Sequence, residues 1–226
     1  MHIEPGVVDG AKIALSYVTA VGAVGYAAKL ALSTVKHDGV APLAVRSMIA
    51  TVLVFCFFQV LPHYPVGVSE VHFILGATLF LIFGAGPAAI GLALGLLAQG
   101  LFFAPTDLPQ YGMNVTSLLV PLLLVDAMAR RLIPQKTAYK DIKYRQALAM
   151  STAYQGGVIA WVAFWAFYGN GFGAENLAQV GSFSAAYALV IVVEPVLDLA
   201  VLAVAKSLHQ LKDSKVFHPR LYRAAA

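Results

Sequence analysis

Two histidines far apart in the chain carry the most specific chemistry that this sequence offers. The chain begins Met1-His2, and His72 lies at the entry to an apolar stretch. A free amine on Met1, the peptide nitrogen of His2 and the His2 imidazole could close two small fused chelate rings and leave one in-plane position open. A tetragonal nitrogen site of this kind suits Ni(II) or Cu(II), and imidazole binds several other late divalent metals. Histidine at position two also arises by chance, so the predicted chelate depends on His72 to complete it.

The composition is that of an integral membrane protein. Of 226 residues, 60% are hydrophobic and 12% are charged, whereas soluble domains carry roughly 25% charged residues. The apolar segments are about twenty residues long, the length that an α-helix needs to cross roughly 30 Å of hydrocarbon. We therefore expect an all-α fold with about seven transmembrane helices in one domain, residues 1–226. The single cysteine, Cys56, excludes a disulfide framework and a CxxC metal site.

The connections between the predicted spans carry charges that indicate an orientation. Lysine and arginine gather around the first and fifth connections and in the tail, whereas the remaining connections contain neither. The positive-inside rule then predicts the N-terminus outside and the C-terminus in the cytoplasm. This topology accounts for the net charge of +4 without nucleic acid as a partner. The predicted spans are residues 11–35, 42–61, 68–84, 86–104, 111–133, 143–168 and 180–207.

The two ends of the chain receive separate predictions. Residues 1–10 contain no lysine or arginine, which a cleavable signal peptide would place ahead of its apolar core. We therefore expect this start to be retained as an N-terminal metal-binding segment. Residues 208–226 are expected to form a basic cytoplasmic tail. With this topology, Met1-His2 and His72 lie on the same outer face of the membrane.

The polar side chains before His72 have a structural and a functional interpretation. Ser69 could cap the helix predicted from residue 68, and Glu70 in the first turn would favour the positive end of the helix dipole. Capping does not explain His72, which would lie one turn deeper. Since an ionisable residue at membrane depth is a functional-site hypothesis by default, His72 is either a metal ligand or a hydrogen-bonded packing residue.

Asn114, at the outer start of the fifth span, also has two interpretations. Its side chain could cap that helix. It could instead accept the proton of the ring nitrogen of His2 or His72 that does not bind metal, a common arrangement around metal sites. His63, in the outer connection, could help to attract metal, although a solvated loop residue is the simpler expectation.

Small residues at four-residue spacing predict close helix packing. They are Ala23, Ala27 and Ala31 in the first span and Gly91 and Gly95 in the fourth. In lipid, such residues let helix backbones approach closely, and packing rather than hydrophobicity drives association. We expect the glycines to pack inside the protein. The alanines serve either internal packing or docking to another membrane protein.

Three further carboxylates lie within predicted spans. Asp126 lies four residues before Arg130, a spacing that predicts an ion pair on one helix face. Glu194 and Asp198 lie one turn apart in the seventh span, with Pro195 between them expected to kink the helix. These two could serve cation passage, or they could form a hydrogen-bonded contact within the bundle.

Four segments occur in the order and approximate spacing of a known family. They are Met1-His2-Ile3-x-x-Gly6, Pro65-x-Gly67-x-Ser69-x-Val71-His72, Gln99-Gly100-Leu101-Phe102 and Gly112-x-Asn114. In these segments the chain resembles the CbiM/NikM proteins, the substrate-specific membrane components of energy-coupling factor (ECF) transporters for cobalt and nickel. The resemblance runs from residue 1 to about residue 125 and, through the pattern of spans, more loosely to the end.

The resemblance implies a ligand set and a set of partners. In that family the terminal amine, the amide and imidazole of the second residue, and the later histidine coordinate the metal; these correspond to Met1, His2 and His72, with Asn114 in support. The transported Co(II) or Ni(II) is then a substrate, and no permanently bound cofactor is expected. The implied partners are a transmembrane coupling (T) subunit, cytoplasmic ATPase subunits and a small auxiliary membrane subunit, in a bacterial or archaeal plasma membrane.

The chain departs from the family pattern at Ser69-Glu70, where the family usually has a pair of small residues. Glu70 adds an anionic group near the predicted site and leaves the preference between cobalt and nickel open. The chain also contains no GxxxxGK[ST] motif. ATP hydrolysis by that route would therefore belong to the partner subunits.

Two other functions compete with transport. A membrane-embedded metalloenzyme could use the same metal site with Glu70 as general base beside an open coordination position, although no HExxH motif occurs. A retinal-type seven-helix protein would need a lysine in the middle of the seventh span, whereas Lys206 lies at the cytoplasmic edge. We therefore predict a substrate-binding membrane component of an ECF-type importer, not an enzyme.

Overall fold

The computed structural model describes residues 2–134 and 137–210 of the chain. The Met1 amine and the predicted basic tail beyond residue 210 lie outside the described residues. The described elements are the 3₁₀ turns η1 (Gly10–Lys12), η2 (Pro105–Gln110) and η3 (Tyr139–Asp141), the strands β1 (Tyr64–Val66) and β2 (Ser69–Val71), and the helices α1 (Ile13–Asp38), α2 (Val40–Gln59), α3 (Gly76–Phe83), α4 (Ala85–Phe102), α5 (Tyr111–Leu132), α6 (Tyr144–Asn170) and α7 (Ala174–Gln210).

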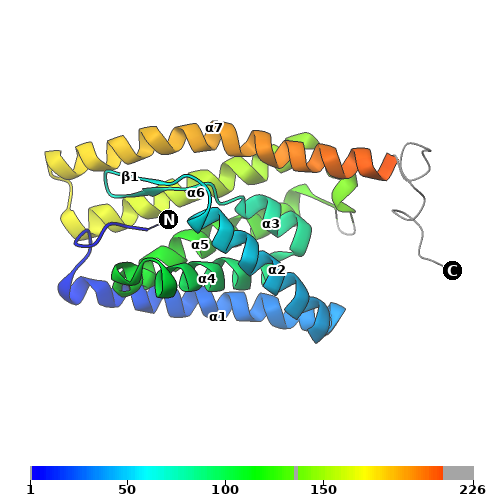
Figure 1. The fold of residues 1–226 in the computed structure, drawn as a ribbon, viewed down its shortest axis with the longest axis horizontal. Helices are drawn as coiled ribbons and strands as arrows, with labels where there is room; N and C mark the ends of the chain where they lie inside the picture. The colour runs from blue at the N-terminus through cyan, green and yellow to red at the C-terminus, as the bar shows by residue number, and fades with distance from the viewer. Residues whose placement is uncertain (1, 135–136, 211–226) are drawn as a thin grey trace.

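Six helices are long and apolar enough to cross a membrane, namely α1, α2, α4, α5, α6 and α7. The predicted all-α membrane fold is therefore confirmed. The long helices run roughly along the longest axis of the molecule (Figure 1). Between α2 and α4 the chain crosses the bundle once more through the segment that contains α3, so the segment before α1 and the last turns of α7 lie at opposite ends of the bundle (Figure 1). Which end faces the cytoplasm stays a prediction.

The third predicted span, 68–84, was wrong as a membrane helix. Its first part forms β2 of an antiparallel hairpin with β1, and the helix α3 begins only at Gly76. Gly67 explains the turn, because its φ is +62° and a Cβ there would lie 2.2 Å from the Gln179 carbonyl oxygen of α7. A positive φ at the first residue of a two-residue turn is typical of type II′ hairpins, and glycine adopts it without strain.

This hairpin changes the positions of the polar residues before α3. Ser69 and Glu70 lie in β2, so neither belongs to the first turn of a helix, and His72 follows the strand in non-helical chain. The third crossing of the bundle combines this non-helical chain with α3. At Gly76, a Cβ would lie 2.2 Å from the ring of Tyr154 in α6, so α3 starts in close contact with α6.

The N-terminal segment pairs with the hairpin as a further strand. Ile3 forms an isolated antiparallel bridge with β2. The Glu4 amide donates to the Val68 carbonyl at 3.1 Å, and the Glu70 amide donates to the His2 carbonyl at 2.9 Å. Because side chains alternate across a strand, a shift of one residue in this pairing would turn His2 to the opposite face.

The glycines of α4 pack inside the protein, as predicted. A Cβ on Gly91 would lie 2.4 Å from the Cβ of Ala50, and one on Gly95 would lie 2.7 Å from the Cβ of Val54. Both contacts are with α2, so the two helices approach as closely as backbone and small side chains allow. Space for a larger side chain is absent at these two positions.

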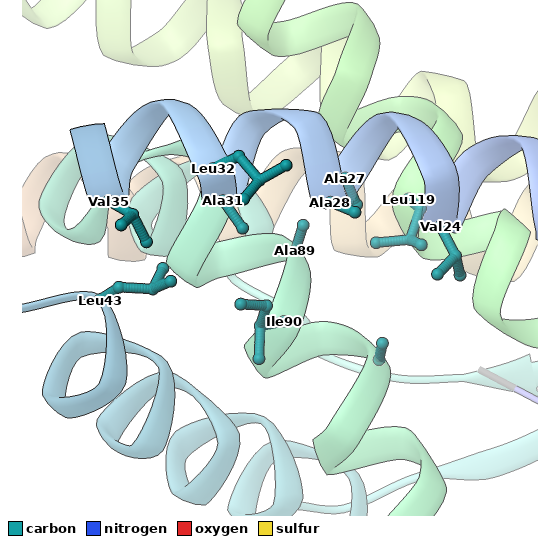
Figure 2. A pocket seen from close by; sticks show the side chains of 11 residues that line it. Val24, Ala27, Ala28, Ala31, Leu32, Val35, Leu43, Ala89, Ile90 and Leu119 are labelled. Atoms are coloured by element: carbon teal, nitrogen blue, oxygen red, sulfur yellow. The ribbon is translucent and has the colours of Figure 1, made fainter. Parts of the chain in front are cut away.

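The alanines of α1 also face the bundle. Ala23 and Ala27 are buried, and a Cβ on Gly86 of α4 would lie 2.9 Å from the Cα of Ala31. Internal packing of this stripe is therefore confirmed, while docking to another protein stays a prediction. Next to the contact, an apolar groove of about 400 Å³ runs between α1 and α4, and Ala27 and Ala31 are among its lining residues (Figure 2).

Candidate metal centre

The pairing of the N-terminal segment with β2 brings His2 and His72 together inside the protein. Their ring centroids lie 5.8 Å apart, and their side chains are only 4% and 1% exposed. Backbone hydrogen bonds and the Ser69 hydroxyl, which donates to the His2 carbonyl at 2.9 Å, hold this arrangement. The sequence placed both histidines on one face of the membrane, and the fold places them in one cluster.

Each imidazole lies beside a carboxylate. His72 Nε2 is 2.9 Å from Glu70 Oε2, and His2 Nδ1 is 2.9 Å from Asp107 Oδ2. Asp107 belongs to η2 and was missed in the sequence analysis. It lies in the predicted outer 105–110 connection, on the same side as His2, so an inventory of acidic residues on that side would have found it.

Other ring nitrogens in this cluster lack partners. His2 Nε2 and His72 Nδ1 are buried and have no hydrogen-bond partner in the described part of the chain. His2 Nδ1 lies beside the Asp107 carboxylate, as described above. Burial lowers the pKa of His2, which keeps the ring neutral at neutral pH. A neutral imidazole with an unpaired nitrogen is the form that binds a metal ion.

The two imidazoles and the Glu70 carboxylate form a group that could hold a metal ion. Within residues 2–134 and 137–210, one donor atom from each of His2, Glu70 and His72 lies within 4.8 Å of the others. Imidazole nitrogen together with carboxylate oxygen suits late first-row divalent ions. Glu70, which the sequence analysis placed beside the site, therefore lies close enough to be a ligand itself.

Aromatic side chains enclose the cluster. Phe58 packs edge-on against His72 with a centroid distance of 5.0 Å and against His2 with one of 6.2 Å. His63 stacks on His72 with a centroid distance of 4.9 Å and an interplanar angle of 13°. The expectation that His63 is a solvated loop residue was therefore wrong, since its ring covers that of His72.

Asn114 holds the N-terminal segment rather than an imidazole. Its Oδ1 accepts a hydrogen bond from the Ile3 amide at 2.8 Å, so the predicted ring partner was wrong. It does not cap a helix either, because α5 begins at Tyr111 and Asn114 lies inside it. The side chain instead fixes the backbone next to His2, and it does so from a position that is 1% exposed.

The remaining carboxylates form internal contacts. Asp126 pairs with Arg130 on one helix face, as predicted. Glu194 accepts hydrogen bonds from the backbone before α3, and Asp198 accepts one from Thr78. Of the two interpretations for Glu194 and Asp198, the structure contains the hydrogen-bonded contact within the bundle.

A comparison with protein families agrees with this architecture. The family model that matches, over residues 2–210, is described as CbiM, the cobalt uptake substrate-specific transmembrane region. The chain belongs to the CbiM family. The resemblance inferred from four short segments is thereby confirmed. As a CbiM-family member, the chain is a membrane component of metal uptake rather than an enzyme, so the metalloenzyme alternative has no support.

Two solved structures share the fold of this CbiM-family chain. One, described as a transition metal transporter, is 19% identical with a TM-score of 0.68, and the match covers 99% of each chain. The other, described as a truncated transition metal transporter, is 17% identical with a TM-score of 0.68 and covers 93% of this chain and 99% of its own. No curated protein matches the chain.

Proposed function

We propose that this CbiM-family chain is the substrate-binding membrane component of an ECF-type ABC importer for Co(II) or Ni(II) in a bacterial or archaeal plasma membrane. The observation that carries the proposal is the group of His2, Glu70 and His72, whose donor atoms lie within 4.8 Å of one another where the N-terminal segment joins the hairpin. The chain captures the ion at this end, and partner subunits supply the energy that releases it on the other side.

The proposed ligands are the Met1 amine, the amide and imidazole of His2, and the imidazole of His72. Only Nδ1 of His2 is near enough to the backbone to close a small chelate ring, and Asp107 Oδ2 lies 2.9 Å from that atom. Two ligand atoms that each bond a metal at about 2.1 Å, with a ligand–metal–ligand angle of about 90°, are about 3.0 Å apart. Asp107 is therefore spaced as a neighbouring ligand of the same ion would be. Glu70 and Asp107 together add two negative charges beside a divalent cation.

The partners in this proposal are a coupling (T) subunit in the membrane, cytoplasmic ATPase subunits and a small auxiliary membrane subunit. The groove beside Ala27 and Ala31 of α1 fits the first of these (Figure 2). Its lining is apolar, and Val24 and Leu32 at its border are largely exposed, so a transmembrane helix can pack there without opening the bundle. Small residues beneath it permit close helix approach.

Extending the N-terminus by one residue tests the proposed function. The extension moves the free amine away from His2 and leaves both imidazoles in place. We expect Ni(II) and Co(II) affinity to fall by more than the roughly 10-fold that disturbing an outer-shell group costs. Calorimetry on purified protein measures the affinity, and mass spectrometry verifies that one form begins at Met1 and the other carries the added residue.

A matched control carries the extra residue after Ala226, which lengthens the chain without touching the amine. This control should bind metal as tightly as the unaltered protein. Full-strength binding by the N-terminally extended form would remove the terminal amine from the ligand set and leave a site built from side chains alone.

A further inference from the structure

Helix α7 contributes a buried carboxylate to the backbone that follows His72. Glu194 is fully buried. Its Oε2 accepts a hydrogen bond from the Ile74 amide at 2.9 Å, and its Oε1 accepts one from the Leu75 amide at 2.7 Å. The Gln155 side-chain amide of α6 donates to the same Oε1. A single carboxylate therefore ties two long helices to the chain two and three residues after His72.

These bonds supply what the start of α3 lacks. The first amides of a helix have no partner within the helix, and the residue at the N-cap position, Leu75, makes no side-chain capping bond. In a membrane, backbone amides outside a regular helix must be satisfied by the protein itself. Glu194 accepts two such amides and also places a carboxylate at the positive end of the α3 dipole.

The conformation of Leu75 shows that this segment is held from outside. Its φ is +52°, and among the described residues it is the one residue other than glycine with a positive φ. For a branched apolar side chain this region is strained, and such strain persists where the surroundings enforce it. The Glu194 carboxylate, bonded directly to the Leu75 amide, is the nearest such constraint.

We propose that Glu194 is a positioning residue for the metal site. By fixing the backbone at 74 and 75, it sets the direction in which His72 leaves the hairpin, and hence the distance of its imidazole from His2. This inference rests on the proposed function, because it assigns Glu194 a role in a site that binds metal. It also explains why the chain keeps a carboxylate at this depth, where an ionisable group is costly unless it is used.

Asp198 offers a matched control on the same helix face. It lies one turn after Glu194 and accepts a hydrogen bond from Thr78. Thr78 is the third residue of α3, so this contact holds the first turn of the helix and not the amides of Ile74 and Leu75. Removing the charge of Asp198 also changes a contact between α7 and α3, but it leaves the acceptor of those two amides in place.

The test uses the full chain in lipid nanodiscs, with Co(II) alone as the probe. Glu194→Ala should weaken Co(II) binding by about 10-fold or more, the range for losing a group that orients a ligand. It should also change the Co(II) absorption spectrum, which reports ligand geometry and does not respond to a loss of stability alone. Glu194→Gln keeps one acceptor oxygen and should give intermediate values, whereas Asp198→Asn should leave both affinity and spectrum unchanged.

Hydrogen exchange without metal provides a second measurement. Glu194→Ala should remove protection from the amides of Ile74 and Leu75, and Asp198→Asn should not. If those amides lose protection while the Co(II) spectrum and affinity stay as in the unaltered protein, Glu194 holds the backbone without positioning the ligand, and the inference is overturned. If Glu194→Ala does not fold, an unchanged spectrum in Glu194→Gln overturns it equally. If the unaltered chain bound neither Co(II) nor Ni(II), the proposed function would be overturned first, and the positioning role with it.

Discussion

Two buried polar clusters in this bundle differ in how completely they are hydrogen-bonded. In the cluster at the hairpin, His2 and His72 each keep a buried ring nitrogen without a partner in the described part of the chain. In the cluster between α3, α6 and α7, both oxygens of Glu194 accept N–H groups, and Tyr187 donates to Gln155 at 2.9 Å. The histidine rings have free nitrogen atoms for a ligand, whereas both oxygens of the Glu194 carboxylate are already bonded.

This difference distinguishes a cluster that has atoms available to bind a ligand from one that holds helices together. Buried polar groups are normally paired, and an unpaired one calls for an explanation such as a ligand. For the unpaired nitrogens at the hairpin, the proposed function supplies a metal ion as that explanation, because a metal needs lone pairs that no hydrogen bond occupies. The burial of the paired Glu194 carboxylate has a different explanation. Three hydrogen-bond donors converge on it, and these bonds hold α6, α7 and the backbone before α3 together. Apart from Glu194 itself, whose bonds hold the backbone after His72, residues of the two clusters should therefore change different properties when they are mutated.

The largest expected effect follows from replacing His72. In His72→Ala the site loses one of its two buried imidazoles, so we expect Co(II) or Ni(II) affinity to fall by more than about 100-fold, the upper end for losing an outer-shell group. Calorimetry with the purified, folded protein measures this. The thermal midpoint without metal should fall as well, because the buried ring packs against Phe58 and its removal leaves a cavity. Metal binding at the original affinity would break the comparison, because the unpaired nitrogen would then have no ligand.

Gln155→Leu should lower stability while leaving metal affinity nearly unchanged. It leaves the Tyr187 hydroxyl without its acceptor and removes one donor from Glu194. We expect a loss of unfolding free energy of about 1 kcal/mol, between the average of about 0.6 kcal/mol for hydrogen bonds between membrane helices and the 1–3 kcal/mol for an orphaned buried group. Thermal unfolding in nanodiscs gives the stability, and calorimetry should show metal affinity within a few-fold of the original. A large loss of affinity at full stability would contradict this comparison, because Gln155 would then contribute to metal binding rather than to stability.

A smaller loss of affinity than for His72 is expected at Glu70, which belongs to the same cluster but is partly exposed. Glu70→Gln keeps an oxygen near His72 Nε2 and removes the negative charge. We expect about a 10-fold loss of affinity for both Co(II) and Ni(II), as for an outer-shell group, and no change in fold. Titrating the two ions in parallel would sharpen the comparison, since an effect on one ion alone would make Glu70 a determinant of metal preference. No change for either ion would place Glu70 outside the site.

The sequence alone determined the class of protein and selected the two histidines that the fold brings together. Apolar segments of membrane length predicted the long helices, because an α-helix must satisfy its own backbone in lipid. The same local reasoning selected His2 and His72 and predicted the Asp126–Arg130 pair, since each depends on spacing along the chain. Four short segments were enough to indicate the CbiM family, which the match over residues 2–210 confirmed.

Only the tertiary structure decided how these residues meet. The span predicted from residue 68 is apolar enough for a helix, yet its first part pairs with β1 and with the N-terminal segment, because Gly67 turns the chain against α7. That pairing sets the distance between the two histidines, brings Asp107 to His2 and gives Asn114 a backbone partner. Glu194 likewise accepts a hydrogen bond from the Leu75 amide, although the two residues are 119 positions apart in the chain. Contacts between residues so distant in sequence depend on how the helices pack, and no local pattern encodes them.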